Sequence, residues 1–212
     1  MICARSRTTA PVPRPDTRLA RSAAPMNLAH LLARAGRATP SAPAQFVGTR
    51  LHSDYRAFSR RAAALATTLR RQGLEPGDRV ALHMTNSPAF LEIVFGAWTA
   101  GLVVVPINNK LHPKEVAYIL QDSEASLLFV SRDVGAALST EMPRNGRALT
   151  VIDVDTRGYE LLLDAEPAPV NNRDADDLAW LFYTSGTTGR PKGVMLSHRK
   201  LLTMTLCYFS DV

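Results

Sequence analysis

Apolar positions along this chain follow two alternating patterns. From Met26 onward, stretches in which apolar residues recur every three or four positions are separated by short runs of consecutive apolar residues. The first pattern is typical of amphipathic helices, and the second of strands that are buried on both faces. Their alternation predicts an α/β fold in which a largely parallel sheet is flanked by helices.

The clearest helix pattern spans residues 54–72, which place their apolar residues on one face. Gly73 follows and can adopt the left-handed conformation that often ends a helix. Ser87 and Pro88 predict a second helix start, with a capping hydroxyl before a proline, and that helix runs to Ala100. Further helices are expected at 28–37, 113–121, 133–139 and 198–209.

Strands are expected where apolar and β-branched residues run together. Residues 102–107 are almost wholly of this type, as in a strand covered on both faces. Residues 177–183 form an apolar strand that leads directly into a glycine-rich segment, after a connecting loop at 164–177 that is rich in Pro, Asn and Asp. Shorter strands are expected at 44–47, 79–84, 126–131, 149–152 and 194–196.

The net charge of +6 raises the question of a nucleic-acid partner. Residues 1–25 hold five arginines and one acid, so the rest of the chain carries a net charge of only +2. No basic stripe with interleaved aromatic residues is evident in that nearly balanced part. No nucleic-acid partner is therefore expected.

The first 25 residues differ in composition from the rest, with four prolines and almost no acid. Arginine-rich, acid-poor composition can mark a mitochondrial transit peptide, but the prolines oppose the amphipathic helix that such a peptide needs. We expect residues 1–25 to be a disordered tail, or a start assigned too early, with Met26 as the true start. Residues 26–212 are then the folded part.

Cysteine spacing and hydropathy argue against a disulfide-rich protein, a cysteine metal site and a membrane-spanning protein. Cys3 and Cys207 lie at opposite ends of the chain without paired spacing, so neither a disulfide framework nor a metal site is expected. Cys207 is expected to be buried and inert within the last helix. No apolar run approaches the roughly 20 residues that span a bilayer. We expect no transmembrane segment and a cytoplasmic location.

The segment Tyr183–Gly193 carries the candidate chemistry. Its sequence, Tyr-Thr-Ser-Gly-Thr-Thr-Gly-Arg-Pro-Lys-Gly, combines four hydroxyl side chains, three glycines and one lysine, Lys192. Glycines let the backbone approach a ligand closely, and successive free N–H groups form an anion-binding concavity. Hydroxyls and a lysine add donors for phosphate oxygens. The segment therefore predicts a phosphate-binding loop.

Two other interpretations of this segment fit less well. A Walker A loop requires Gly-Lys-Ser/Thr at its end, whereas here Gly189 and Lys192 are three residues apart and no hydroxyl follows the lysine. A flexible Gly/Ser/Thr linker has no need of an apolar strand before it or of Pro-Lys after it.

At these residues the chain resembles the adenylate-forming superfamily, which includes acyl- and aryl-CoA synthetases, luciferases and peptide-synthetase adenylation domains. The family's phosphate loop reads Tyr/Phe-Thr-Ser-Gly-Ser/Thr-Thr-Gly-x-Pro-Lys-Gly, and every specified position is matched. Residues 73–80, 86–90 and 101–108 also resemble family segments, so the similarity covers about 27–212. Pro-Ile-Asn at 106–108 is closer to acyl-CoA synthetases than to peptide synthetases.

The resemblance implies binding of the ATP β- and γ-phosphates by Thr184, Ser185, Gly186, Thr187, Thr188, Gly189 and Lys192. It implies an acid–thiol ligase, such as a long-chain-fatty-acid–CoA ligase of fatty acid metabolism. ATP, with Mg²⁺, activates a small carboxylic acid to an acyl-adenylate, and coenzyme A then takes the acyl group. We assign no catalytic residue and no protein-borne metal site.

The same resemblance implies that residues 26–212 are a partial AMP-binding N-terminal domain that ends after the phosphate loop, with the C-terminal domain absent. We expect a truncated ligase that does not catalyse adenylation alone. A stand-alone nucleotide-binding or regulatory module, or an unrelated α/β protein, remain as alternatives. His198 lies where the family often has histidine, which makes it a possible pocket residue, although helix-start packing explains it too. His83 is expected to be a satisfied core residue.

Overall fold

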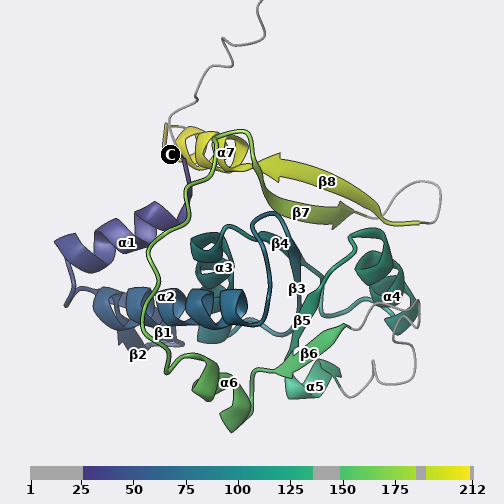
Figure 1. The fold of residues 1–212 in the computed structure, drawn as a ribbon, viewed down its shortest axis with the longest axis horizontal. Helices are drawn as coiled ribbons and strands as arrows, with labels where there is room; N and C mark the ends of the chain where they lie inside the picture. Colours follow the sequence, from purple (N-terminus) through teal and green to yellow (C-terminus); the bar gives the residue numbers. More distant parts are fainter. Residues whose placement is uncertain (1–25, 136–148, 185–189, 211–212) are drawn as a thin grey trace, which may run out of the picture.

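The computed structural model describes residues 26–135, 149–184 and 190–210, and these form an α/β fold (Figure 1). The helices in the described part are α1 Ala29–Ala38, α2 Tyr55–Arg71, α3 Pro88–Ala100, α4 Pro113–Asp122, α5 Arg132–Gly135, α6 Arg157–Leu162 and α7 His198–Ser210. The strands are β1 Pro43–Val47, β2 Arg50–Asp54, β3 Arg79–His83, β4 Val103–Pro106, β5 Leu127–Val130, β6 Thr150–Asp153, β7 Leu178–Thr184 and β8 Lys192–Ser197.

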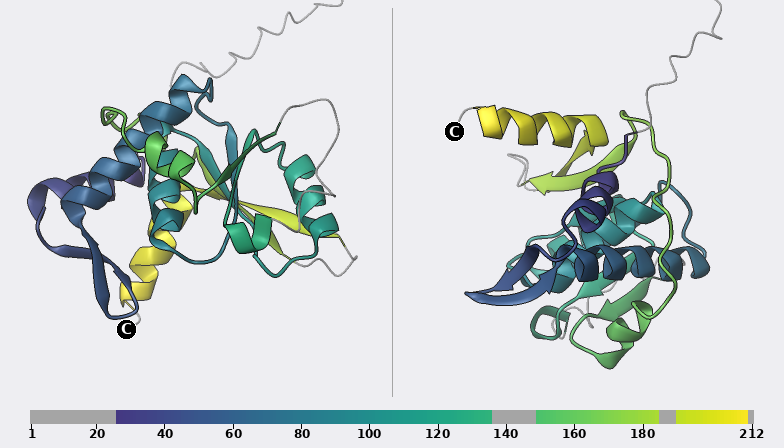
Figure 2. Two further views of the ribbon diagram at one scale, coloured as in Figure 1. Left: turned by 90° about the horizontal axis from the view of Figure 1, so that it is seen from below. Right: turned by 90° about the vertical axis from the view of Figure 1, so that its left-hand side faces the viewer.

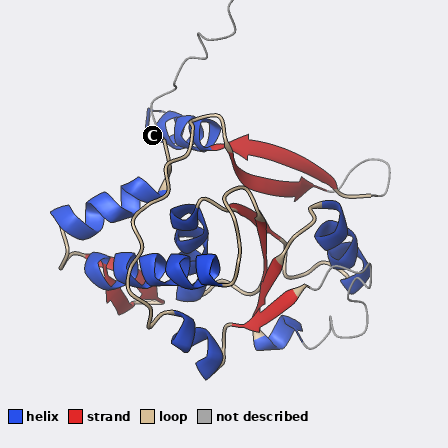
Figure 3. Cartoon of the chain, in the orientation of Figure 1, coloured by secondary structure: helices blue, strands red, loops and turns tan. Residues whose placement is uncertain are grey.

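Six of these strands form one sheet in the order β6-β5-β3-β4-β7-β8 (Figure 3). All neighbours pair in parallel except β7 and β8, which form an antiparallel hairpin at one edge. The expected largely parallel sheet is therefore confirmed. The separate β1–β2 hairpin contains one strand, β2, that the sequence did not predict.

Helices cover both faces of the sheet because the chain crosses over β3 when it passes from β4 to β5. A parallel connection is almost always right-handed, so reversing the direction of travel moves the connecting helix to the other face. One apolar cluster joins α2 and α3 to one face of the sheet, and a second joins α4 to the other face. Figure 2 shows α4 well away from α1 and α2.

The two ends of α3 test the predicted capping residues. Gly101 follows the helix in the left-handed conformation, with φ of 86°, as a glycine after a helix should. At the other end, the expected capping hydroxyl is wrong, since Ser87 makes no side-chain cap hydrogen bond. Pro88 alone favours the helix start, because proline has no N–H that would need a partner there.

Arg61 of α2 forms ion pairs with Glu92 of α3, which is buried, and with Glu160 of α6, which is exposed. Arg61 Nε donates to Glu92 Oε1 at 2.6 Å, and Arg61 Nη1 donates to Glu160 Oε2 at 2.9 Å. The hydroxyl of Tyr159 donates to Glu92 Oε2 at 2.9 Å. Glu92 is fully buried, so these donors replace the water that its carboxylate would otherwise require.

Candidate active site at the β7–β8 hairpin

The predicted phosphate loop connects β7 to β8, the two strands of the edge hairpin. Cross-strand pairing runs from Leu178 and Ser197 at one end to Thr184 and Lys192 at the other. Thr184 and Lys192 therefore flank the loop from opposite strands. The remaining predicted phosphate ligands, Ser185, Gly186, Thr187, Thr188 and Gly189, lie outside the described residues.

The hairpin keeps its two strands close because a glycine lies opposite an aromatic residue. Gly193 pairs with Tyr183 across the strands. A Cβ atom on Gly193 would lie 3.1 Å from Leu181 Cδ1 and 3.2 Å from Tyr183 Cζ, which is tighter than ordinary contact. The last glycine of the motif thus makes room for the Tyr183 ring against the opposing backbone.

The Tyr183 side chain in turn ties the loop end of the hairpin to α4. Its hydroxyl donates to Asp122 Oδ2 at 2.6 Å. Burial raises the pKa of the Tyr183 hydroxyl above its ordinary value, and the hydrogen bond to Asp122 acts in the same direction. Tyr183 therefore stays protonated at neutral pH and acts as a fixed donor. The first residue of the motif positions the loop and has no need to contact the ligand.

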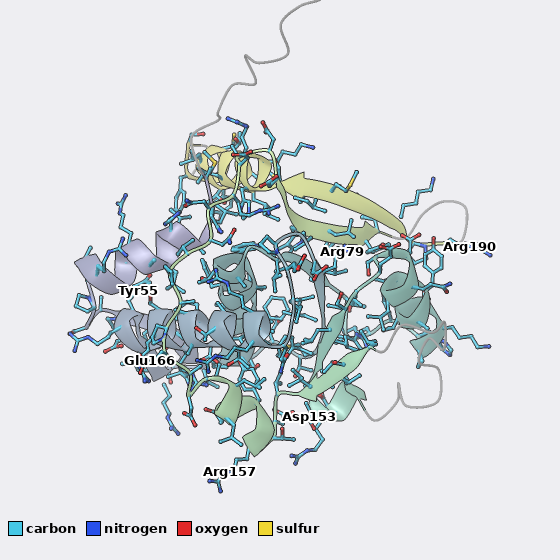
Figure 4. The ribbon with its side chains drawn as sticks, viewed as in Figure 1. Tyr55, Arg79, Asp153, Arg157, Glu166 and Arg190 are labelled. Carbon is cyan, nitrogen blue, oxygen red and sulfur yellow. The ribbon has the colours of Figure 1, made fainter. Side chains whose placement is uncertain are left out.

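Arg190 and Lys192 bring two positive charges to this end of the hairpin, where two carboxylates of α4 also lie. The guanidinium of Arg190 lies 5.9 Å from the centre of the Tyr118 ring on α4, and Figure 4 shows Arg190 beside α4 at the loop end. A surface pocket of about 600 Å³ lies there, lined by α4 residues together with Arg190 and Pro191. Lys192 is exposed and forms no ion pair with any residue that the structure describes. Its charge is available for an anion.

The described part of this site fits a nucleotide phosphate by its chemistry. A threonine hydroxyl and a lysine ammonium flank the loop, and both donate to phosphate oxygens. No group of three or more His, Cys, Asp or Glu residues gathers within the described ranges. A magnesium ion that accompanies a nucleotide is usually bound by phosphates, by water and by one or two carboxylates, so it needs no dedicated protein cage.

His198 lies at the other end of the hairpin from the loop. It is six positions from Lys192 along an extended strand, which corresponds to about 20 Å. Its ring is buried, its Nδ1 accepts a hydrogen bond from the backbone N–H of Leu28 at 3.2 Å, and its edge faces Trp98. Burial lowers the pKa of His198 to about 4, and nearby Arg173 adds to the effect. This geometry favours helix-start packing over a pocket role.

His83 is a core residue as expected, but one of its ring nitrogens is not satisfied by any residue that the structure describes. The ring is buried at the carboxyl end of β3, but its Nδ1 has no hydrogen-bond partner among the described residues. Burial lowers the pKa of His83, and the backbone of Ile107 and Asn108 opposes that shift. A neutral ring is thus favoured. This part of the expectation failed because a strand pattern shows that a residue is buried but not which atoms lie beside its ring nitrogens.

The exposure of Cys207 also corrects an expectation. Its thiol is free and exposed on α7, although the sequence predicted a buried, inert cysteine. The helix contacts the core through its first turns, at His198, Leu201 and Leu202. Beyond these residues α7 extends away from the sheet, so its apolar side chains are exposed.

Comparisons with known proteins agree with this geometry. The sequence profile of the AMP-binding enzyme family matches residues 32–211, which is most of the chain and includes the whole hairpin. The chain belongs to this family. Its sequence is 42% identical over 174 residues to a feruloyl-CoA synthase from an Amycolatopsis species, covering 79% of this chain and 33% of that protein.

Other members of the AMP-binding enzyme family place the chain among acyl-CoA synthetase-like proteins. A long-chain-fatty-acid–CoA ligase of Mycobacterium tuberculosis is 34% identical over 164 residues, covering 76% of this chain and 32% of that protein. The crystal structure of the N-terminal domain of FACL13 from the same organism superposes with a TM-score of 0.72 and 33% identity, covering 82% of this chain and 44% of that domain.

The chain spans about a third of the length of the curated relatives it matches, and it matches the N-terminal domain of adenylate-forming enzymes. Among the described residues, no helix combines the length and apolarity that crossing a bilayer requires.

Proposed function

We propose that this chain supplies the ATP phosphate-binding wall of an adenylate-forming acid–thiol ligase. The hairpin geometry supports the proposal, because Thr184 and Lys192 pair across the strands at its loop end and Tyr183 ties that end to Asp122. The similarity to a feruloyl-CoA synthase and to a long-chain-fatty-acid–CoA ligase supports the reaction class.

The reaction proceeds in two balanced steps. A carboxylate oxygen of the acid attacks the α-phosphorus of ATP, which forms an acyl-adenylate and releases pyrophosphate. The thiol of coenzyme A then attacks the acyl carbon, which forms the thioester and releases AMP and the thiol proton. The role of the hairpin is to hold the β- and γ-phosphates, and Lys192 offsets the charge on the departing pyrophosphate. The proposed acids are aryl or fatty acids, by analogy with the relatives.

The 212-residue chain alone is proposed to lack adenylation activity. Charge-assisted hydrogen bonds contribute about 1.5–3 kcal/mol each. Association of a ligand costs on the order of 4–15 kcal/mol before any net affinity appears. A few loop contacts therefore bind ATP weakly without the adenine and acyl pockets.

A chimeric enzyme tests the proposal. Residues 32–211 replace the matching segment of the feruloyl-CoA synthase, and ATP–pyrophosphate exchange is measured with that enzyme's acid. Lys192→Ala is expected to slow exchange roughly 10- to 100-fold, because one charge-assisted contact is lost. Lys200→Ala, which removes an exposed lysine of α7, is the matched control and is expected to change the rate less than about twofold. Equal rates for the two variants would contradict the role of Lys192.

A further inference from the structure

A second cavity lies on the far side of the molecule from the phosphate loop. It has a volume of about 530 Å³ and is enclosed by α1, α2 and the segment 167–170. Figure 1 shows α1 and α2 at the opposite side of the molecule from the loop end of the β7–β8 hairpin. No role that we have proposed for the chain uses this cavity.

The close crossing of α1 and α2 shapes the cavity. A Cβ atom on Gly36 would lie 2.7 Å from Ser59 Cβ, so the two helices meet closely at this point. Residues spaced three or four apart on α2 then face α1, and Arg56, Arg60 and Ala63 line the cavity from that helix. The third side is held in place because Ala168 N donates to the carbonyl of Ala63 at 3.0 Å and Thr67 Oγ1 donates to Glu166 O at 2.5 Å.

The charges around this cavity are all of one sign. Its lining includes His30, Arg37, Arg56 and Arg60, and it includes no acidic residue. The sequence shows the same imbalance, since residues 27–74 contain eight arginines and a single acid, Asp54. The nearly balanced charge of residues 26–212 therefore hides a separation into a basic α1–α2 region and an acidic remainder.

Asp54, the single acid among residues 27–74, caps a helix and does not neutralise the arginines at the cavity. Asp54 Oδ1 accepts a hydrogen bond from Ala57 N at 2.8 Å and caps α2. Figure 4 shows Tyr55, at the start of α2, and Glu166, beside that helix. Glu166 belongs to neither the cavity lining nor any ion pair of the described residues, and it adjoins Pro167 of the third wall.

Four of the five arginines of α2 fall into two groups. Arg61 is paired with Glu92 and Glu160, and Arg70 donates to the carbonyls of Thr99 and Pro169. Arg56 and Arg60, together with Arg37 of α1, form no ion pair within the described ranges and are exposed at the cavity. The arginines of the first group connect parts of the fold to one another. Those of the second group make no such connection in the part of the chain that the structure describes.

We infer that this cavity binds a phosphorylated small molecule through Arg37, Arg56 and Arg60. A guanidinium presents a planar fork of donors that matches two phosphate oxygens, and three such groups around one cavity suit a diphosphate or a phosphomonoester. A bound anion also relieves the repulsion between like charges. The cavity is within the size range of small-molecule sites, about 300–1,000 Å³. Its apolar wall, with Ala29, Leu32 and Ala62, accommodates the uncharged part of such a ligand.

Inorganic pyrophosphate is the probe, titrated into the 212-residue chain by calorimetry at low and moderate salt. Lys192→Ala is present in every sample, so that binding at the phosphate loop does not contribute. The test variant is Arg37→Ala/Arg60→Ala. The control is Arg34→Ala/Arg71→Ala, which removes two exposed arginines from the same two helices outside the cavity lining. Both variants have the same net charge, and far-UV circular dichroism checks their fold.

Pyrophosphate is expected to bind the control with unchanged affinity, within about twofold, and the test variant at least about tenfold more weakly, which is a difference of about 1.4 kcal/mol. A parallel titration with phosphatidylglycerol vesicles distinguishes the source of the phosphate. Binding to vesicles with the same arginine dependence but not to pyrophosphate would assign a lipid headgroup.

Three results would overturn the inference. One is equal weakening in the two double variants, which would show a diffuse charge effect. Another is the absence of arginine-dependent binding to either probe, and the third is tighter binding to a DNA duplex than to pyrophosphate. None of them bears on the phosphate loop, because Lys192 is already replaced in every sample.

Discussion

The parallel strands and the edge hairpin are built from similarly apolar sequence, yet they are packed very differently. Val103, Val104 and Val105 of β4 and all of β5 are buried between helices on both faces. In β8, by contrast, residues Lys192–Met195 are exposed, and Tyr208 and Phe209 of α7 are 69% and 74% exposed. The hairpin and α7 lie along one side of the body in Figure 1 and in the right-hand view of Figure 2.

The difference in burial indicates that the parallel strands and the hairpin have different roles. The buried strands provide the stability of the fold, because each large apolar side chain removed from water contributes about 1.5–3 kcal/mol. The hairpin presents the phosphate loop and is held to the body by a few defined contacts, among them Tyr183 with Asp122 and His198 with Leu28. Changes in the two regions should therefore differ in size and kind.

The largest expected effect comes from truncating an aromatic residue in the sheet. Phe129 of β5 is fully buried, so Phe129→Ala leaves a cavity and is expected to lower the free energy of unfolding by about 3–5 kcal/mol. Phe209→Ala makes the same chemical change on the exposed part of α7 and is expected to cost less than about 0.5 kcal/mol. Urea unfolding followed by circular dichroism measures both values. Similar losses of unfolding free energy in the two variants would contradict the difference in packing between the sheet and α7.

An intermediate effect should appear as pH dependence at the joint between α7 and α1. The pKa of His198 is about 4 in the folded chain, against 6.5 ordinarily. The unfolded state thus binds the extra proton first, and stability is lost as pH falls from about 6.5 to about 4, by about 2–3 kcal/mol. His198→Gln keeps an acceptor for Leu28 without titrating, so it should flatten this part of the stability profile. If stability depended on pH in the same way in His198→Gln, groups other than His198 would be responsible for the loss at low pH.

The smallest expected effect concerns the contact between the hairpin and α4. Tyr183→Phe removes the hydroxyl that donates to Asp122 at 2.6 Å and is expected to cost about 1 kcal/mol. Tyr118→Phe removes a longer contact of 3.5 Å to the same carboxylate and is the control, with an expected cost below about 0.3 kcal/mol. Faster amide exchange in β7 and β8 in the Tyr183 variant alone would show local loosening of the hairpin, whereas equal exchange would exclude it.

Sequence patterns predicted those parts of the fold whose signals are local. The apolar run of β4, the left-handed glycine after α3 and the proline before it correspond to elements within one or two residues of their expected bounds. Each rests on a residue type that has few conformations available to it. The phosphate loop motif identified the family in the same way, because ten of its eleven positions are restricted to one or two residue types.

Features that depend on distant residues were missed. Strand β2 buries only Ser53 and is held by its pairing with β1, so its own sequence shows no alternation. Helix α6 is six residues long and is fixed by Tyr159 in the core. The reversal of β8 and the gathering of arginines at one cavity both arise from how segments meet in space. The apolar periodicity within a single segment cannot predict such contacts between segments.

The order of strands in the sheet also bears on how the chain is made. The three central strands β5, β3 and β4 come from residues 79–130, whereas β7 joins them by pairing Trp180 with Val104. During synthesis on the ribosome, the central strands and α3 therefore emerge and can assemble before the motif has been translated. The proposed phosphate loop is translated after the three strands that form the centre of the sheet, and a chain stalled in translation before residue 178 would lack the segment that we propose to hold a triphosphate.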